Sequence, residues 1–123
     1  MSINKQDLIF IVDDDLFWSN ILHQLLISIG YNNIKTYENG LDCVNNLSLS
    51  PKVIFLDYQM NGKNGLEVLK EINTQANNFK IIFCTAHEDL SVAMGAMQGG
   101  SFDYLLKNNA TEKEIKSILE KIN

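Results

Sequence analysis

Short apolar runs alternate along the chain with longer segments in which apolar residues recur every three or four positions. The short runs are rich in β-branched and aromatic residues, and several contain no polar residue, which is typical of strands buried on both faces of a sheet. They predict five strands, at residues 8–12, 34–37, 53–56, 81–84 and 104–106.

The longer segments predict five helices, each with its apolar side chains gathered on one face. The clearest covers residues 16–29 and is followed by Gly30 as a C-terminal cap, and the last begins at Thr111, which can cap together with Glu114. The apolar positions of these two helices are Trp18, Ile21, Leu22, Leu25 and Ile29 in the first and Ile115, Ile118, Leu119 and Ile122 in the last. Three shorter helices are marked by Leu41, Val44 and Leu47, by Leu66, Leu69 and Ile72, and by Val92, Ala96 and Met97.

The alternation of strands and helices predicts an α/β fold with a doubly wound, five-stranded parallel sheet covered by helices on both faces. A chain of 123 residues is long enough for one domain with one hydrophobic core. No repeat, low-complexity tract or linker divides it. We therefore expect a single domain over residues 1–123.

Composition and charge narrow the classes of function. The net charge of −5 argues against direct binding to nucleic acid or to an anionic membrane surface. The two cysteines, Cys43 and Cys84, lack the spacing of metal ligands and are expected to be buried packing residues. The N-terminal segment 1–7 has no apolar core of a signal peptide, and no apolar stretch has the length of a membrane span, so a cytoplasmic location is expected.

Aspartates follow two of the predicted strands. Asp13, Asp14 and Asp15 come directly after the first strand, and Asp57 ends the third. If both strands lie parallel in one sheet, their ends meet at one edge, where ligands bind in open α/β sheets. Asp15 is expected to cap the following helix. The remaining carboxylates predict a cation site in the crevice.

Residues after the later strands extend this set. Thr85 follows the fourth strand and Lys107 follows the fifth. An acidic pair, an aspartate, a hydroxyl and a lysine, each ending its own strand in this order, resemble the receiver domain of two-component response regulators of the chemotaxis-regulator kind. Met60, Gly65 and Gly100 also fit that pattern, so the resemblance spans essentially the whole chain. It implies a flavodoxin-like sheet with strand order 2-1-3-4-5.

The resemblance also implies roles for individual residues. Asp57 would accept a phosphoryl group as an aspartyl phosphate. Mg²⁺, for which Mn²⁺ could substitute, would be bound by Asp14 and Asp57, by Asp13 through water and by the backbone carbonyl of Gln59. Lys107 and the hydroxyl of Thr85 would contact the phosphoryl oxygens.

In the same family, phosphorylation switches a surface formed by the fourth helix, the fifth strand and the fifth helix. The resemblance implies that Thr85 moves toward the phosphoryl group and that the ring of Tyr104 fills the vacated space. Gln59 and His87 occupy positions that tune how fast the acyl phosphate is hydrolysed. Two departures from the family are Asn108, where a proline in a cis peptide bond is common, and Asn61, where many members have proline.

The expected function is therefore a regulatory domain and not a classical enzyme. It would take its phosphoryl group from a sensor histidine kinase or a phosphotransfer protein, control an effector or output domain, and dephosphorylate itself; the resemblance also allows a homodimer on activation. One alternative is a phosphohydrolase of the haloacid dehalogenase type that uses Asp13 and Asp15. The other is a receiver-like interaction module that works without phosphorylation.

Overall fold

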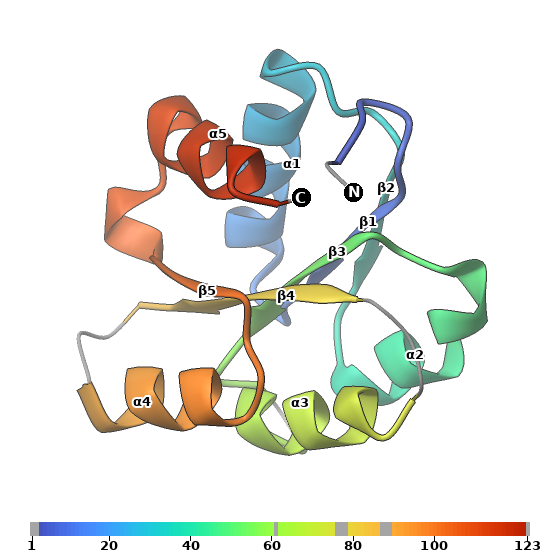
Figure 1. Ribbon diagram of the computed structural model, residues 1–123, viewed down its shortest axis with the longest axis vertical. Coiled ribbons are helices and arrows are strands. Elements are labelled where there is room, and N and C mark those ends of the chain that lie inside the picture. The colour runs from blue at the N-terminus through green and yellow to red at the C-terminus, as the bar shows by residue number, and fades with distance from the viewer. Residues whose placement is uncertain (1–2, 61, 76–78, 87–89, 123) are drawn as a thin grey trace.

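The computed structural model describes residues 3–60, 62–75, 79–86 and 90–122 and contains one five-stranded sheet (Figure 1). All neighbouring strands are parallel, and their order is β2-β1-β3-β4-β5, as predicted. The strands are β1 (Ile9–Val12), β2 (Ile34–Tyr37), β3 (Val53–Asp57), β4 (Lys80–Thr85) and β5 (Asp103–Leu106).

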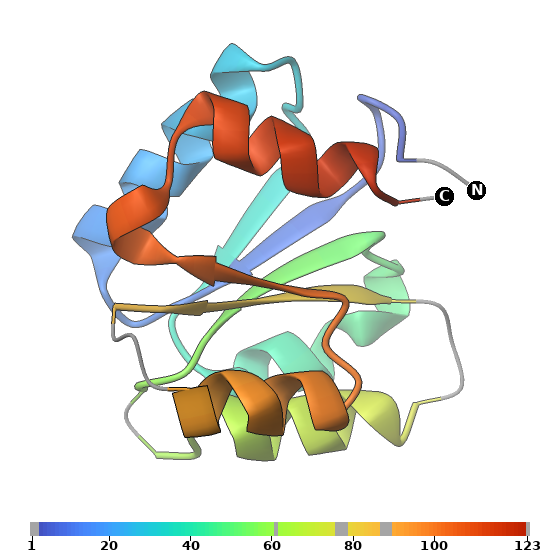
Figure 2. The same cartoon turned by 60° about the vertical axis from the view of Figure 1, so that its left-hand side comes forward.

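Helices cover both faces of this sheet, which confirms the doubly wound α/β fold. Figures 1 and 2 show α1 and α5 on one face and α2, α3 and α4 on the other. Their bounds are α1 (Leu16–Ser28), α2 (Gly40–Asn45), α3 (Gly65–Asn73), α4 (Leu90–Gln98) and α5 (Glu112–Glu120), with short 3₁₀ turns η1 (Leu47–Leu49) and η2 (Lys107–Asn109). No helix in the described part of the chain is long and apolar enough to cross a membrane.

Apolar side chains of the central strands point alternately into two cores, one on each face of the sheet. Ile9 and Ile11 of β1 pack with α1 and α5, whereas Phe10 and Val12 pack with the helices of the other face. Because both faces of each strand are covered, β1 contains no polar residue and β3 contains none before Asp57. The edge strand β2 differs, with its middle residues exposed to solvent.

The strand register brings the carboxyl ends of four strands to the same edge. Val12 of β1 lies opposite Leu56 of β3, so Asp13 and Asp57 follow at the same level. Asp57 in turn lies opposite Cys84, and Thr85 lies opposite Leu106. The candidate residues that the sequence places at the ends of separate strands therefore lie close together at one edge of the sheet.

Helix α1 ends close to the predicted point, but its buried face is different. Its buried residues are Trp18, Ser19, Leu22 and Leu26, whereas the predicted Ile21 is 37% exposed. Gly30 has the predicted capping role, because its φ of +104° suits glycine and its N–H donates to the carbonyl of Ile27. The first helix has apolar residues on most of its circumference, so spacing alone did not identify the face that packs.

Smaller differences concern element ends and two shorter helices. Leu8 lies outside β1, while β3, β4 and β5 each include at least one polar residue beyond the predicted run. The predicted apolar positions Leu41 of α2 and Met97 of α4 are exposed, at 66% and 49%. Leu47 is buried as predicted but belongs to η1, because α2 ends at Asn45.

Gly65, the first residue of α3, allows the chain to turn tightly behind Asp57. Its N–H donates to the carbonyl of Tyr58 at 2.7 Å. A Cβ atom at position 65 would lie 2.3 Å from the carbonyl oxygen of Asp57 and 2.8 Å from the Cα of Tyr58. Both neighbours are backbone atoms of the segment that carries Asp57, so a larger residue would displace that segment.

We expect Gly65→Ala to lower the free energy of unfolding by about 1–3 kcal/mol, the usual range for overpacking a well-packed site. Gly95→Ala in α4 is the matched control, because its Cβ would meet only the Leu66 side chain, at 3.5 Å. Alanine also has the higher helix propensity, so this control should be as stable as the parent or slightly more stable. Thermal unfolding of both variants measures the effect, and equal melting temperatures would contradict the assigned backbone contact.

Candidate functional site

A cleft opens at the carboxyl edge of the sheet, where the sequence places its candidate residues. Its volume is about 210 Å³, and its lining comes from the ends of β3, β4 and β5 and the β1–α1 connection. The lining residues are Asp14, Asp15, Asp57, Gln59, Thr85, Ala86 and Lys107. Asp13 lies beside it, paired with Lys107.

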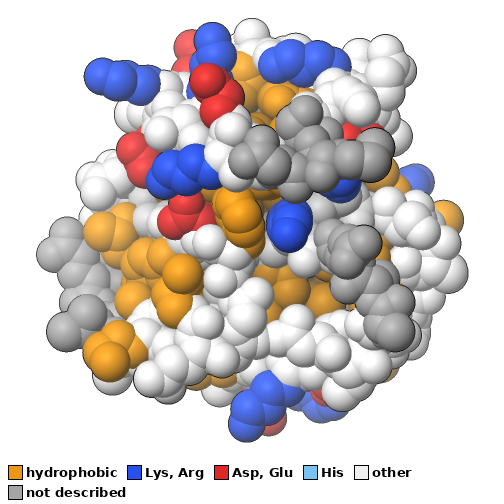
Figure 3. Space-filling view, viewed as in Figure 1, with side chains coloured by type: hydrophobic (Ala, Val, Ile, Leu, Met, Phe, Trp, Pro, Cys, Tyr) orange, Lys and Arg blue, Asp and Glu red, His pale blue; other side chains and the backbone are white. Residues whose placement is uncertain are grey.

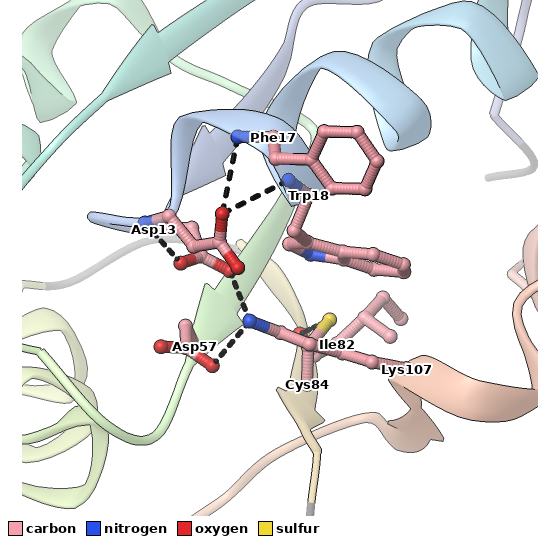
Figure 4. A network of polar contacts seen from close by, with 8 residues as sticks. Asp13, Phe17, Trp18, Asp57, Ile82, Cys84 and Lys107 are labelled. Carbon is pink, nitrogen blue, oxygen red and sulfur yellow. Dashed lines mark hydrogen bonds and ion pairs between the residues drawn. The ribbon is translucent and has the colours of Figure 1, made fainter.

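Lys107 joins two of the carboxylates. Its Nζ lies 2.6 Å from Oδ2 of Asp13 and 3.1 Å from Oδ1 of Asp57, between the ends of β1, β3 and β5 (Figure 4). The side chains of Asp13 and Asp57 are only 1% and 5% exposed. Charges this deeply buried require partners, and the ammonium supplies one to both carboxylates.

The start of α1 fixes the acidic segment. Oδ1 of Asp13 accepts a hydrogen bond from the Asp15 N–H at 2.9 Å. Oδ1 of Asp15 accepts from the N–H groups of Phe17 and Trp18 at 3.1 and 3.2 Å, which makes it the N-cap of α1 (Figure 4). The predicted capping role of Asp15 is confirmed, and its carboxylate is engaged with the helix.

Asp13, Asp14 and Asp57 together fit a small divalent cation. Each offers a carboxylate oxygen, and these three oxygens lie within 4.8 Å of one another. Oxygen donors of this kind are the ligands that Mg²⁺ prefers, often with only one or two carboxylates and several waters. The acidic cluster is therefore compatible with Mg²⁺ binding.

Burial favours the protonated forms of the two buried carboxyls in the cleft. Burial, reinforced by the charge of Asp13, raises the pKa of Asp57 to about 7, although Lys107 acts in the opposite direction. Burial also raises the pKa of Asp13 despite its hydrogen bond to Lys107. For Lys107, burial lowers the pKa, but the hydrogen bond to Asp13 and the charge of Asp57 outweigh it and raise the pKa overall. A further cation in the cleft would favour the ionised forms of both carboxyls.

The other predicted residues lie around this centre. Thr85 is buried at the end of β4 and lines the cleft, and Gln59 is exposed at its rim. Tyr104 is half-buried on β5, and its ring stacks on Phe83 with centroids 6.3 Å apart. His87 and Asn61 lie outside the described residues.

Lys107 is followed by Asn108, where members of the resembled family often have a proline in a cis peptide bond. No peptide bond among the described residues is cis, so the Lys107–Asn108 bond is trans. The chain passes directly from β5 into η2, in which the N–H of Ala110 donates to the carbonyl of Lys107.

Trp18 was predicted only as a packing residue of the first helix. Trp18 is 6% exposed, and the ammonium of Lys107 lies over its ring, with Nζ 5.4 Å from the ring centroid. Its position one turn after the acidic segment was visible in the sequence, but its contact with Lys107 joins α1 to the segment after β5, which are distant along the chain.

Comparison with known proteins identifies the family. A family model described as the response regulator receiver domain matches residues 9–120. The DNA-binding transcriptional regulator NtrC of Escherichia coli K12 is 36% identical over 104 residues, which cover 84% of this chain but 22% of NtrC. The chain therefore matches about a fifth of that regulator's length. The chemotaxis protein CheY of Thermotoga maritima is 30% identical over 100 residues, which cover 80% of this chain and 83% of CheY.

Solved structures share the fold over nearly the whole chain. A complex of Borrelia burgdorferi described as CheX-CheY-BeF3-Mg²⁺ aligns with a TM-score of 0.84, covering 94% of this chain and 87% of the other at 22% identity. That likeness concerns the fold alone. Together with the family match over residues 9–120, the sheet order and the acidic cleft, it leaves one assignment: the chain belongs to the response regulator receiver domains of two-component systems.

Proposed function

We propose that this receiver domain, taken as one unit over the whole chain, accepts a phosphoryl group on Asp57 from a phosphohistidine of a sensor kinase or phosphotransfer protein. One observation carries the proposal: the buried Asp57 carboxylate lies 3.1 Å from the ammonium of Lys107, in a cleft with two further carboxylates. Aspartate is an established covalent acceptor of phosphoryl groups, and a positioned cation is the main assistance that such a transfer needs.

The transfer itself is a substitution at phosphorus. An oxygen of Asp57 forms a bond to phosphorus while the bond from phosphorus to the donor imidazole nitrogen breaks, and that nitrogen keeps the electron pair and takes up a proton. Lys107 pairs with the phosphoryl oxygens, and the Thr85 hydroxyl donates a hydrogen bond to one of them. Lys107 contacts Asp57 at 3.1 Å, so its ammonium lies within reach of a phosphoryl group on that residue.

Asp13, Asp14 and Asp57, with the backbone carbonyl of Gln59, would hold the divalent cation that this chemistry requires, Mg²⁺ or in its place Mn²⁺. When bound, the ion offsets the repulsion between the anionic donor and the carboxylates, which is about 4 kcal/mol for two unit charges ~4 Å apart at an effective dielectric constant near 20. The clustering of three carboxylate oxygens supports this assignment. The Borrelia CheY complex, which shares the fold, is described as containing Mg²⁺ together with BeF3.

The geometry favours this function over the two alternatives. A haloacid dehalogenase mechanism would use Asp13 and Asp15 as nucleophile and acid. Here Asp13 is paired with Lys107, and Asp15 is the exposed N-cap of α1. A receiver-like module without phosphorylation would not require a buried lysine bridging two buried carboxylates, which is costly to maintain.

The output surface that we propose is formed by α4, β5 and α5. Figure 3 shows hydrophobic side chains gathered between α4 and β5 and charged ones over α5. Met94 and Met97 of α4 are 51% and 49% exposed. Movement of Thr85 toward a phosphoryl group would change the space available to the ring of Tyr104 and so bias this surface. Its partner is an effector protein, an output domain or a second copy of this chain.

The proposal also covers the location of the domain and the loss of its phosphoryl group. The exchange takes place in the cytoplasm, and the net charge of −5 argues against contact of this domain with nucleic acid or membrane. Self-catalysed hydrolysis ends the signal, and Gln59 at the rim of the cleft, together with His87, sets its rate. Any transcriptional output would belong to a part of the protein beyond this receiver, as the length of NtrC relative to the match illustrates.

Incubation with acetyl phosphate and Mg²⁺ tests the proposal. We expect intact-mass measurement to show one added phosphoryl group per chain, which is lost again on standing, and none when EDTA replaces Mg²⁺. A small phosphoester should undergo no multiple-turnover hydrolysis. Steady turnover of the phosphoester would instead support a phosphohydrolase, and an unmodified protein in Mg²⁺ would support the interaction module.

A further inference from the structure

We propose that Trp18 is a positioning residue for Lys107: its indole face retains the ammonium in the cleft when a metal ion takes over the carboxylates. The inference rests on the function proposed above. It adds a role at the site for Trp18, which the sequence analysis named only as an apolar residue of the first helix. It concerns a contact between the first turn of α1 and the end of β5.

The ring of Trp18 is held in a defined place. The residue is 6% exposed and belongs to the core that packs α1 and α5 against the sheet. Its backbone N–H donates to Oδ1 of Asp15, so the capped start of α1 fixes the residue from which the ring extends. Figure 4 shows the indole alongside the Lys107 side chain, on the α1 side of the two carboxylates.

The ammonium lies within cation–π range of this ring. Lys107 Nζ is 5.4 Å from the ring centroid, and such contacts are favourable within about 6 Å, most of all with tryptophan and when water is excluded. The Lys107 side chain is only 14% exposed, so the contact is largely desolvated. The ring is therefore a further partner of the ammonium, beside Asp13 and Asp57.

The contact with the ring matters because Asp13 and Asp57 are proposed metal ligands. A divalent cation at Asp13, Asp14 and Asp57 would compete with Lys107 for the same oxygens and repel its ammonium. A lysine side chain is long and flexible, and without a partner in the cleft it would gain entropy by moving into solvent. The indole face offers attraction for which the hard metal ion does not compete, since Mg²⁺ selects oxygen ligands.

Packing and positioning are distinguished by two substitutions. Trp18→Phe keeps an aromatic face, while Trp18→Met fills the core with a flexible apolar side chain that has no face. Both remove volume from the same site and should lower the melting temperature to a similar extent. A role in packing alone predicts equal behaviour in every assay, whereas a role in positioning Lys107 predicts that phenylalanine rescues function and methionine does not.

The first measurement is made in EDTA. Trp18 is the single tryptophan of the chain, so indole fluorescence reports on this site alone. We expect Lys107→Met to change the emission of the folded protein, and we expect the unfolding effects of Trp18→Met and Lys107→Met to be non-additive. Leu26→Ala, in the same core two turns further along α1, should be additive with Lys107→Met. Unchanged emission together with full additivity for Trp18 would overturn the contact.

The second measurement is the rate of phosphoryl incorporation from acetyl phosphate with Mg²⁺. Trp18→Met should be slower than Trp18→Phe by about fivefold to thirtyfold, the span that corresponds to cation–π energies from partly exposed to desolvated sites. In a Lys107→Met background this difference should disappear. Equal rates for the two Trp18 variants would overturn the inference. A wild-type protein that incorporates no phosphoryl group would contradict the proposed function instead, and the EDTA measurements would still decide the contact.

Discussion

Asp57→Asn is expected to abolish phosphoryl incorporation from acetyl phosphate in Mg²⁺, with no added mass after an incubation that modifies the parent completely. The amide lacks the anionic oxygen that forms the bond to phosphorus, and it also removes one of the three carboxylates of the proposed metal cluster. Both effects act on the same step, so we expect a loss larger than that from any other single substitution in the cleft.

Asp15→Asn is the matched control for this experiment. It removes a carboxylate that also lines the cleft, but asparagine caps helices about as well as aspartate, so α1 should keep its N-cap. We expect this variant to incorporate one phosphoryl group at close to the parent rate. Loss of incorporation in Asp15→Asn with retention in Asp57→Asn would move the acceptor to the acidic segment after β1, as the haloacid dehalogenase alternative requires.

Asp57→Asn should remain folded, which makes its loss of incorporation interpretable. The pKa of Asp57 is raised by burial to about 7 in the folded protein, above its ordinary value of 3.8. The folded state therefore binds the proton more tightly, and the contribution of this carboxyl to stability decreases as the pH rises from about 4 through 7. The amide has no such titration, so in EDTA at pH 8 the variant should unfold at a higher temperature than the parent.

The sheet and the location of the site could be predicted because both follow from short-range patterns. A strand covered on both faces must be apolar at every position, and Leu8–Val12 and Val53–Leu56 show this without reference to the rest of the chain. The register of parallel strands then brings Asp13 and Asp57 to one edge. Capping depends on neighbouring residues, which is why Asp15 and Gly30 were assigned correctly.

Features that depend on long-range packing were not predicted. Helix α1 has apolar residues on several sides, and only the position of the sheet decides that Leu26 is buried while Phe17 is 76% exposed. The pattern of the family included Gly65, but not the reason for it, which is the approach of α3 to the backbone of Asp57. Lys107 lies 50 or more positions from each of its contacts with Asp13, Asp57 and Trp18, and no spacing rule addresses such contacts.

Lys107→Met is expected to lower the free energy of unfolding in EDTA at pH 8 by about 2–4 kcal/mol, near the range for removing one partner of a buried ion pair. Asp13 and Asp57 would then face each other with no cation between them, at 1% and 5% side-chain exposure. Lys121→Met is the control, because its pair with Asp103 at 3.3 Å is at the surface, with the lysine 61% exposed. It should change stability by less than about 1 kcal/mol.

The dependence of this deficit on pH and metal identifies its cause. Removing Lys107 removes an influence that lowers the pKa of both Asp13 and Asp57, so the folded variant takes up protons at higher pH than the parent. Protonation neutralises the repulsion, and the deficit should shrink as the pH falls from 8 to 5. Mg²⁺ should stabilise the variant more than the parent, because Lys107 no longer competes for the carboxylates. Chemical denaturation at both pH values, with EDTA and with Mg²⁺, measures these differences. A deficit that is the same in all four conditions would show that Lys107 contributes through packing and not through its charge.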